Sequence, residues 1–146
     1  FDTHLDYRPD TSVRRAQVTE MLDIMGRIRD PVILLGDLNA PPYAPELAPL
    51  VQRLGDAWVE GQGRAPRRGR SAEDSARGDE GAGGTTGRTY PASAPTKRID
   101  YVLVSPGLRV LRARVVDTGA SDHRPVVVSL DVPAGGISPQ RPAGTS

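Results

Sequence analysis

One long polar stretch, residues 61–88, limits what this chain can fold into. It is rich in Gly, Arg, Ala, Asp and Glu and has no hydrophobic period, so it cannot bury enough apolar surface to pack, and we expect a disordered loop. The four acidic residues at 73, 74, 79 and 80 offset the arginines at 64, 67, 68 and 70, and no aromatic residue lies among them to stack on bases, which argues against a nucleic-acid-binding patch. The folded part must therefore come from residues 1–60 and 89–132, and residues 133–146 should form a flexible Pro- and Gly-rich tail.

The composition sets further limits. The chain has 146 residues, which corresponds to at most one domain, and 37% of them are hydrophobic. A formal net charge of +1 gives no basis for inferring a nucleic-acid partner. The lack of cysteine excludes disulfides and thiolate metal sites, and no apolar run is long enough to span a bilayer. The sequence begins with strand-like residues at Phe1, which predicts an internal fragment of a longer protein.

Hydrophobic spacing predicts two helices and one early strand. Residues 11–29 have apolar residues at helical spacing, and the first helix should begin at Thr11 or Ser12. Residues 32–35 are apolar without interruption, which predicts a strand covered on both faces and ending at Gly36. Residues 45–54 predict a short helix in which Pro49 lies in the first turn or interrupts it.

Three more strands are expected after the polar stretch, at residues 99–104, 108–116 and 125–132. The sequence "SPG" at Ser105–Gly107 predicts a tight turn between the first two. A short turn between successive strands favours antiparallel pairing, so we expect these two strands to form a hairpin.

Four polar clusters lie at the starts or ends of the hydrophobic strands: "THLD" (3–6), "GDLNA" (36–40), "KRIDYVL" (97–103) and "SDHRPV" (121–126). Each has a plain structural explanation when taken alone, such as turn formation by Asp37 and Asn39. Asp100 is harder to explain this way, because a carboxylate inside an apolar strand is costly unless it is paired. Strands that end at one edge of a sheet can bring distant residues together, so the four clusters together predict a site.

This combination of motifs resembles the endonuclease/exonuclease/phosphatase superfamily, the DNase I-like metal-dependent phosphoesterases. The resemblance covers residues 1–60 and 89–132, and "GDLNA" and "SDHRPV" carry it most specifically. It implies an α/β fold of the α+β type, a two-sheet, four-layer sandwich of which this chain is the C-terminal part. It also implies a hydrolase that cleaves a phosphodiester or phosphomonoester through in-line attack by an activated water.

The resemblance also implies a role for each polar residue. Asp37 would orient or deprotonate the attacking water, and Asn39 would hold a phosphate oxygen. His123 would bond another phosphate oxygen while Asp100 fixes its ring, and His4 would contact the phosphate or assist the leaving group. The sequence leaves open whether Asp37 or the Asp100–His123 pair is the base.

A divalent metal ion is part of the same resemblance. Asp122 resembles a metal ligand beside the catalytic histidine, and the main glutamate ligand is expected upstream of this chain. Carboxylate, carbonyl and water oxygens suit Mg²⁺, with Mn²⁺ or Ca²⁺ as alternatives. Without that glutamate, we expect these 146 residues alone to bind metal weakly and to hydrolyse little.

The expected partner is a phosphate-ester substrate, with nucleic acid as one class, and we infer no obligate protein partner. Tyr90, Lys97 and Arg98 are candidates for holding a phosphate or stacking on a base or sugar, or they form only the rim. Arg124 is a candidate for binding phosphate or for pairing with a surface acid.

Two other classes of function compete with a phosphoesterase. Ser121, His123 and Asp100 would be a nucleophilic triad in a serine hydrolase, but Ser121 lacks the G-x-S-x-G elbow. A catalytically incompetent fragment or a binding module of the same fold is the other alternative. The joint presence of all the polar residues favours an active parent protein.

Overall fold

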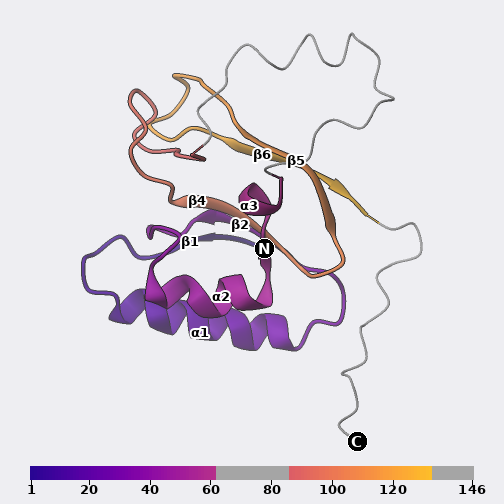
Figure 1. Cartoon of the computed structure of the whole chain (residues 1–146). Helices are drawn as coiled ribbons and strands as arrows, with labels where there is room; N and C mark the ends of the chain where they lie inside the picture. Colours follow the sequence, from indigo (N-terminus) through magenta and orange to yellow (C-terminus); the bar gives the residue numbers. More distant parts are fainter. Residues whose placement is uncertain (62–85, 133–146) are drawn as a thin grey trace, which may run out of the picture.

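The computed structural model describes residues 1–61 and 86–132. Nearly all of the expected loop at 61–88, and the whole of the expected tail at 133–146, lie outside the described residues. Among those described, four strands form one sheet and two form another (Figure 1). The larger sheet has the order β1-β2-β4-β3, with β1 at Asp2–His4, β2 at Ile33–Asp37, β3 at Gly55–Asp56 and β4 at Asp100–Val104. The second sheet pairs β5, Arg109–Val115, with β6, Val126–Asp131.

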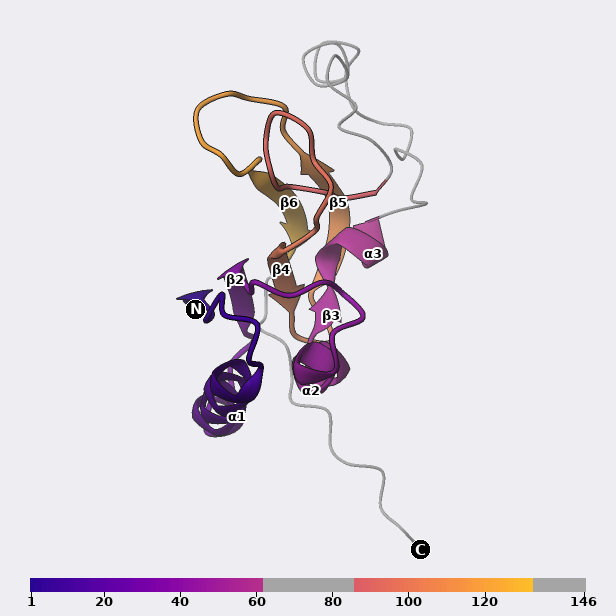
Figure 2. The ribbon, with the colours of Figure 1, turned by 90° about the vertical axis from the view of Figure 1, so that its left-hand side faces the viewer.

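Two of the helices lie on one side of the four-stranded sheet, and the second sheet lies on the other (Figures 1 and 2). Helices α1 (Ser12–Gly26) and α2 (Ala48–Arg53) cover one face, and the short 3-10 helix η1 (Pro45–Leu47) leads into α2. Helix α3 (Ala57–Gly61) contacts β4 and β5. The predicted combination of helices with two sheets is therefore confirmed.

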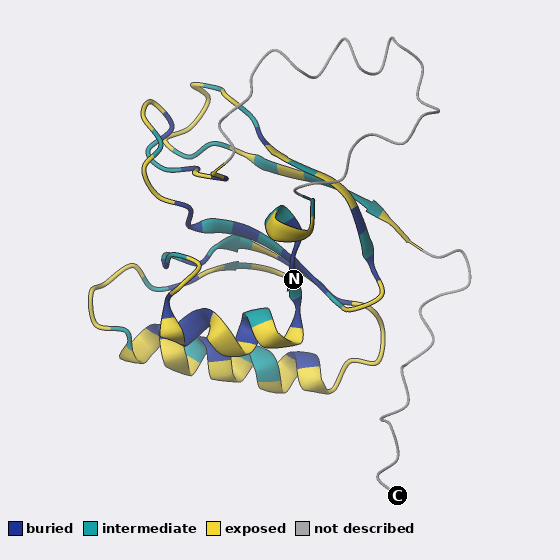
Figure 3. Ribbon diagram, in the orientation of Figure 1, coloured by how far each residue is buried: buried dark blue, intermediate teal, exposed yellow. Residues whose placement is uncertain are grey.

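A separate apolar core fills each side of the larger sheet (Figure 3). Leu34 and Leu103 point toward the helices, where they are buried with Met25. Val104 points to the other side and is buried with Val110 of the second sheet. Alternating residues of a strand face opposite sides, so one strand serves both cores. Each fully buried Leu or Val contributes about 1.5–3 kcal/mol, so both cores hold β4 in place between them.

The helix predictions hold with shorter bounds. Helix α1 ends at Gly26, so Ile28 lies beyond it and is 37% exposed. The carboxylate of Asp10 accepts a hydrogen bond from the backbone N of Ser12 at 2.9 Å, which satisfies one free N–H at the helix start. Pro49 lies in the first turn of α2, the first of the two predicted alternatives, where its missing N–H costs no helical hydrogen bond.

The early strand differs from its prediction in two respects. It runs on to Asp37, and Leu35 is 42% exposed, so it is not covered on both faces within the described residues. Gly36 has a φ of +140°, and a Cβ there would lie 1.8 Å from the carbonyl oxygen of Thr3. Only glycine lets β1 approach this closely at a position next to Asp37.

The predicted hairpin between residues 99–104 and 108–116 is wrong. The turn itself is present, with Leu108 N donating to Ser105 O at 3.2 Å and Gly107 at a φ of +97°. However, β4 already pairs with β2 on one edge and with β3 on the other. No hydrogen-bonding edge of β4 is left for β5, so the turn carries the chain into the second sheet.

Candidate active site

Three of the predicted site residues lie side by side across neighbouring strand ends. His4 is the register partner of Asp37, and Asp37 is the register partner of Asp100. Register partners place their side chains on the same face of a sheet. Asp37 shares its face with Ile33, which packs against the core between the two sheets. The row of polar side chains therefore faces the second sheet.

His123 reaches this row from the loop that connects β5 to β6. Two backbone hydrogen bonds hold the loop, from Ala92 N to Asp122 O at 2.7 Å and from Arg124 N to Thr89 O at 2.8 Å. The His123 ring lies against Tyr90, with 4.7 Å between the ring centroids. The segment around Tyr90 thus serves as a support that fixes the histidine.

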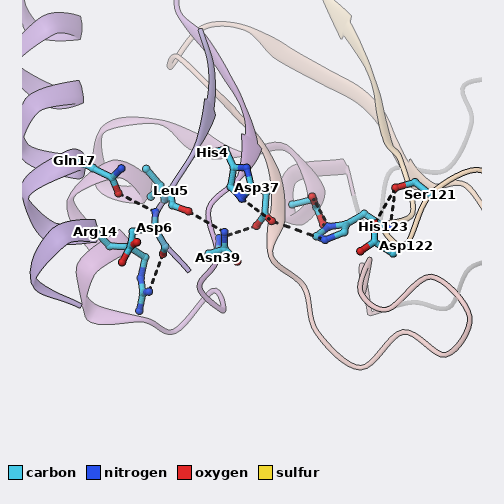
Figure 4. A network of polar contacts seen from close by, with 11 residues as sticks. His4, Leu5, Asp6, Arg14, Gln17, Asp37, Asn39, Ser121, Asp122 and His123 are labelled. Atoms are coloured by element: carbon cyan, nitrogen blue, oxygen red, sulfur yellow. Dashed lines mark hydrogen bonds and ion pairs between the residues drawn. The ribbon is translucent and has the colours of Figure 1, made fainter. Parts of the chain in front are cut away.

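The imidazole of His123 links the loop of the second sheet to the strand ends of the larger sheet (Figure 4). Its Nδ1 lies 3.0 and 3.1 Å from the two carboxylate oxygens of Asp100. Its Nε2 faces the opposite way and is 3.9 Å from Oδ2 of Asp37. The same oxygen of Asp37 lies 3.6 Å from Nε2 of His4, whose side chain is largely exposed. The structure therefore brings together four of the five predicted catalytic side chains.

Burial and neighbouring charge shift two pKa values in this cluster. Burial raises the pKa of Asp37, and the charge of Asp100 adds to this, against a hydrogen bond from Asn39 and the nearby histidines. Burial alone would lower the pKa of His123, but its hydrogen bond with Asp100 and the surrounding carboxylates outweigh burial and raise it. His123 is thereby favoured as a charged donor, and Asp37 becomes a better proton acceptor.

Asn39, the fifth predicted residue, is held beside the cluster by its own backbone conformation. Its φ is +49°, a left-handed conformation that asparagine tolerates. Its backbone N donates to Oδ1 of Asp37 at 2.8 Å, and its side-chain Nδ2 donates to Leu5 O at 2.9 Å. The hydroxyl of Tyr101 donates to Ala40 O at 2.8 Å and anchors the same loop to β4. Nδ2 carries two hydrogens, so one is left for a ligand.

A buried network holds the end of β1, where His4 lies (Figure 4). Arg14 of α1 donates to the carbonyls of Asp6 and Arg8, at 2.9 and 2.6 Å. Its guanidinium also pairs with Glu46 at 2.9 Å, and both side chains are almost completely buried. Gln17 accepts a hydrogen bond from Asp6 N at 3.0 Å.

Sequence reasoning missed these positioning residues. A signal was present for Arg14, because it lies on the same helical stripe as Val18 and Met25, both of them buried. A charged residue on a buried stripe needs a partner, which predicts a structural ion pair. No comparable signal marked Tyr101, whose hydrogen bond depends on how the loop at Ala40 folds.

One group of side chains that could hold a metal ion occurs among the described residues: Asp37, Asp100 and His123, with possible ligand atoms all within 4.8 Å of one another. The carboxylates suit a hard ion, but Nδ1 of His123 is already bonded to Asp100. Asp122 does not belong to this group. It is exposed, and its Oδ1 lies 3.2 Å from the hydroxyl of Ser121.

Two of the residues predicted to contact substrate have partners inside the protein. Arg98 is buried and pairs with Asp56, which ties the residues just before β4 to β3. Arg124 donates to Ala92 O at 2.6 Å and pairs with Asp117 at 2.9 Å, in agreement with its predicted alternative of binding a surface acid. Tyr90, by contrast, lies directly beside the His123 ring.

Ser121 is not placed as a nucleophile. Its hydroxyl accepts a hydrogen bond from the backbone N of His123 and contacts Asp122, both at 3.2 Å. The free ring nitrogen of His123, Nε2, is directed toward Asp37 instead. This geometry does not favour a triad of Ser121 with His123 and Asp100.

The chain matches the Endonuclease/Exonuclease/phosphatase family over residues 2–123 and therefore belongs to it. The fold is also similar to that of solved structures. A mannosyl-6-phosphatase from Bacteroides thetaiotaomicron VPI-5482 has a TM-score of 0.63 and 24% identity, with 90% of this chain and 50% of that chain covered. The human Nocturnin catalytic domain with bound sulfate anion has a TM-score of 0.58 and 21% identity, with 89% and 46% covered. A functionally unknown conserved protein from Enterococcus faecalis V583 has a TM-score of 0.65 and 20% identity, with 89% and 48% covered.

This chain thus spans about half the length of the solved structures that it matches. The comparison with curated proteins gave no match. In the part of the chain that the structure describes, no helix is both long and apolar enough to cross a membrane. The DNase I-like fold predicted from the motifs is confirmed. The four polar clusters of this chain lie together at one end of the sheets.

Proposed function

We propose that the full-length protein hydrolyses a phosphate ester by in-line attack of water, assisted by a divalent metal ion. The observation that carries this proposal is the position of His123, which bonds Asp100 through Nδ1 and turns Nε2 toward Asp37. Such an arrangement offers an anionic phosphate a cationic donor next to a proton acceptor. Family membership and the mannosyl-6-phosphatase and Nocturnin neighbours support phosphate-ester chemistry.

We assign a separate role in the reaction to each side chain of the cluster. Asp37 orients the attacking water and accepts its proton, because its raised pKa makes it the better base. Protonated His123 donates from Nε2 to a phosphate oxygen, while Asp100 fixes its ring and favours its charge. Asn39 donates its second amide hydrogen to another phosphate oxygen, and His4 lies near enough to assist the leaving group.

The donors present fit a hard ion only in part, because His123 bonds Asp100 through Nδ1 and, as the charged donor proposed here, keeps a hydrogen on Nε2 and cannot bind a metal through it. We assign the carboxylate of Asp122 as the metal ligand of this chain, since it is exposed beside the cluster and oxygen donors suit Mg²⁺, Mn²⁺ or Ca²⁺. When bound, the ion would supply positive charge next to the phosphate.

A metal-dependence assay tests the proposal. Hydrolysis of a panel of phosphate monoesters and diesters by the full-length protein should be abolished by EDTA and restored by Mg²⁺. A serine-directed reagent should leave the rate unchanged. Inhibition by that reagent with full activity in EDTA would instead favour the serine hydrolase, and no hydrolysis of any ester would favour the binding module.

A further inference from the structure

One peptide group connects helix α1 to the side chain of Asn39 (Figure 4). The carbonyl of Leu5 accepts a hydrogen bond from Nδ2 of Asn39 at 2.9 Å. The N–H of Asp6, which belongs to the same peptide group, donates to Oε1 of Gln17 at 3.0 Å. The C=O and the N–H of a trans peptide point to opposite sides. Asn39 and Gln17 therefore hold one peptide plane from its two ends.

This peptide group fixes the direction of the Asn39 side chain. The backbone of Asn39 is held separately, because its N donates to Oδ1 of Asp37 at 2.8 Å. Its side chain has one hydrogen-bond partner within the described residues, the carbonyl of Leu5. The hydrogen of Nδ2 that bonds Leu5 determines where the second hydrogen points, since both lie in the plane of the amide. A rotation of the Leu5–Asp6 peptide would therefore turn away the hydrogen that we assign to the phosphate.

Helix α1 resists this rotation through two side chains. Gln17 holds the N–H of Asp6, and Arg14 holds the carbonyl of Asp6 at 2.9 Å. Residues three apart lie on the same side of a helix, so both side chains reach the end of β1 together. Arg14 is anchored in turn by Glu46. The hydrogen bonds on both sides of the Leu5–Asp6 peptide are partly buried, which strengthens them against competing water.

We propose that Gln17 is a positioning residue for phosphate-ester hydrolysis and acts through the Leu5–Asp6 peptide on the amide of Asn39. This rests on the proposed function. A purely structural role, in which Gln17 satisfies one backbone N–H, would affect the stability of the fold alone. A positioning role makes the effect of Gln17 on the reaction depend on Asn39.

Steady-state kinetics of the full-length protein test this role. Gln17→Leu removes the acceptor and should lower kcat about tenfold, less than the 10²-fold that a 1 Å misplacement can cost. KM should change little, because the donor of Asn39 is needed most in the transition state. Gln17→Glu keeps an acceptor oxygen and should stay near the parental rate. Gln52→Leu makes the same change at an exposed position of α2 and should leave kcat unaltered.

A double-mutant cycle connects the loss to Asn39. Asn39→Ala removes the donor and should lower kcat by about 10²–10³-fold. Adding Gln17→Leu to that variant should cause no further loss, because residues that act through one contact are not additive. Losses in kcat that multiply would overturn the proposal, since Gln17 would then act by another route.

Hydrogen exchange of the Asn39 side-chain amide, followed by NMR, gives a readout without turnover. In the parent protein one amide hydrogen should exchange slowly, and Gln17→Leu should speed its exchange while Gln52→Leu does not. Rapid exchange in the parent, or unchanged exchange in folded Gln17→Leu, would overturn the positioning role even if the parent hydrolyses phosphate esters. If the exchange responds as expected but the parent hydrolyses no ester, the proposed function fails while the link from Gln17 to Asn39 stands.

Discussion

Charged side chains are paired one to one where α1 meets η1, but not at the ends of β1, β2 and β4. Arg14 and Glu46 neutralise each other and are almost completely buried. At the strand ends, Asp37 and Asp100 lie directly opposite each other in register, and the histidines near them are partly open to solvent. Like charges opposite each other in a sheet destabilise it. The first region stabilises the fold, whereas the second keeps an unbalanced charge that is suited to binding and catalysis.

The largest expected effect is the loss of catalysis when the strand-end cluster is broken. In the full-length protein, Asp37→Ala or His123→Ala should lower the rate of phosphate-ester hydrolysis by about 10²–10⁴-fold, the contribution typical of a positioned acid or base. The free energy of unfolding should change little, because both residues are only partly buried and Asp37→Ala also removes a repulsion with Asp100. Initial rates and urea unfolding measure the two effects. Near-parental turnover in either variant would contradict the assigned roles.

For the ion pair of Arg14 with Glu46, between α1 and η1, we expect a large effect on stability instead. Arg14→Ala leaves Glu46 buried without its partner and should lower the free energy of unfolding by about 3–5 kcal/mol, measured by denaturant titration. Arg15→Ala is the matched control at an exposed neighbouring position and should have an effect near zero.

A double variant sharpens the comparison. Arg14→Met combined with Glu46→Leu removes both charges and should recover much of the lost stability. A stable Arg14→Ala protein would show that this pair does not hold the fold, and the contrast between the two regions would then be lost.

The site could be predicted from sequence to the extent that strand position determines it. Asp37 and Asp100 lie at strand ends, and pairing in register brings them together, so the motifs were enough to expect the cluster. The pairing of β4 with β5 could not be predicted correctly from the "SPG" turn, because β2 and β3 occupy both edges of β4. Local turn chemistry specifies a change of direction but not which edges are free.

Side-chain partners from distant elements were the hardest to predict. The sequence made Arg98 a candidate for binding substrate, but Asp56, far away in sequence, neutralises it in the interior. Gln17 has no motif of its own, and its link to Asn39 depends on how the end of β1 lies between α1 and the loop after β2. Such contacts depend on tertiary packing, which hydrophobic spacing does not encode.

The smallest expected effect concerns the pH dependence of the link between the two sheets. Asp100 raises the pKa of His123 above its unfolded value of about 6.5. A raised folded pKa stabilises the protein fully below the unfolded pKa, and this stabilisation is lost as the pH rises through the folded pKa. Asp100→Asn should therefore lower the free energy of unfolding more at pH 6 than at pH 9, and it should lower the pKa of His123 in an NMR titration. Asp131→Asn, which removes an exposed carboxylate paired with Arg109 on β5, should leave that titration unchanged. An unaltered His123 titration in Asp100→Asn would mean that the two sheets are not coupled through this imidazole.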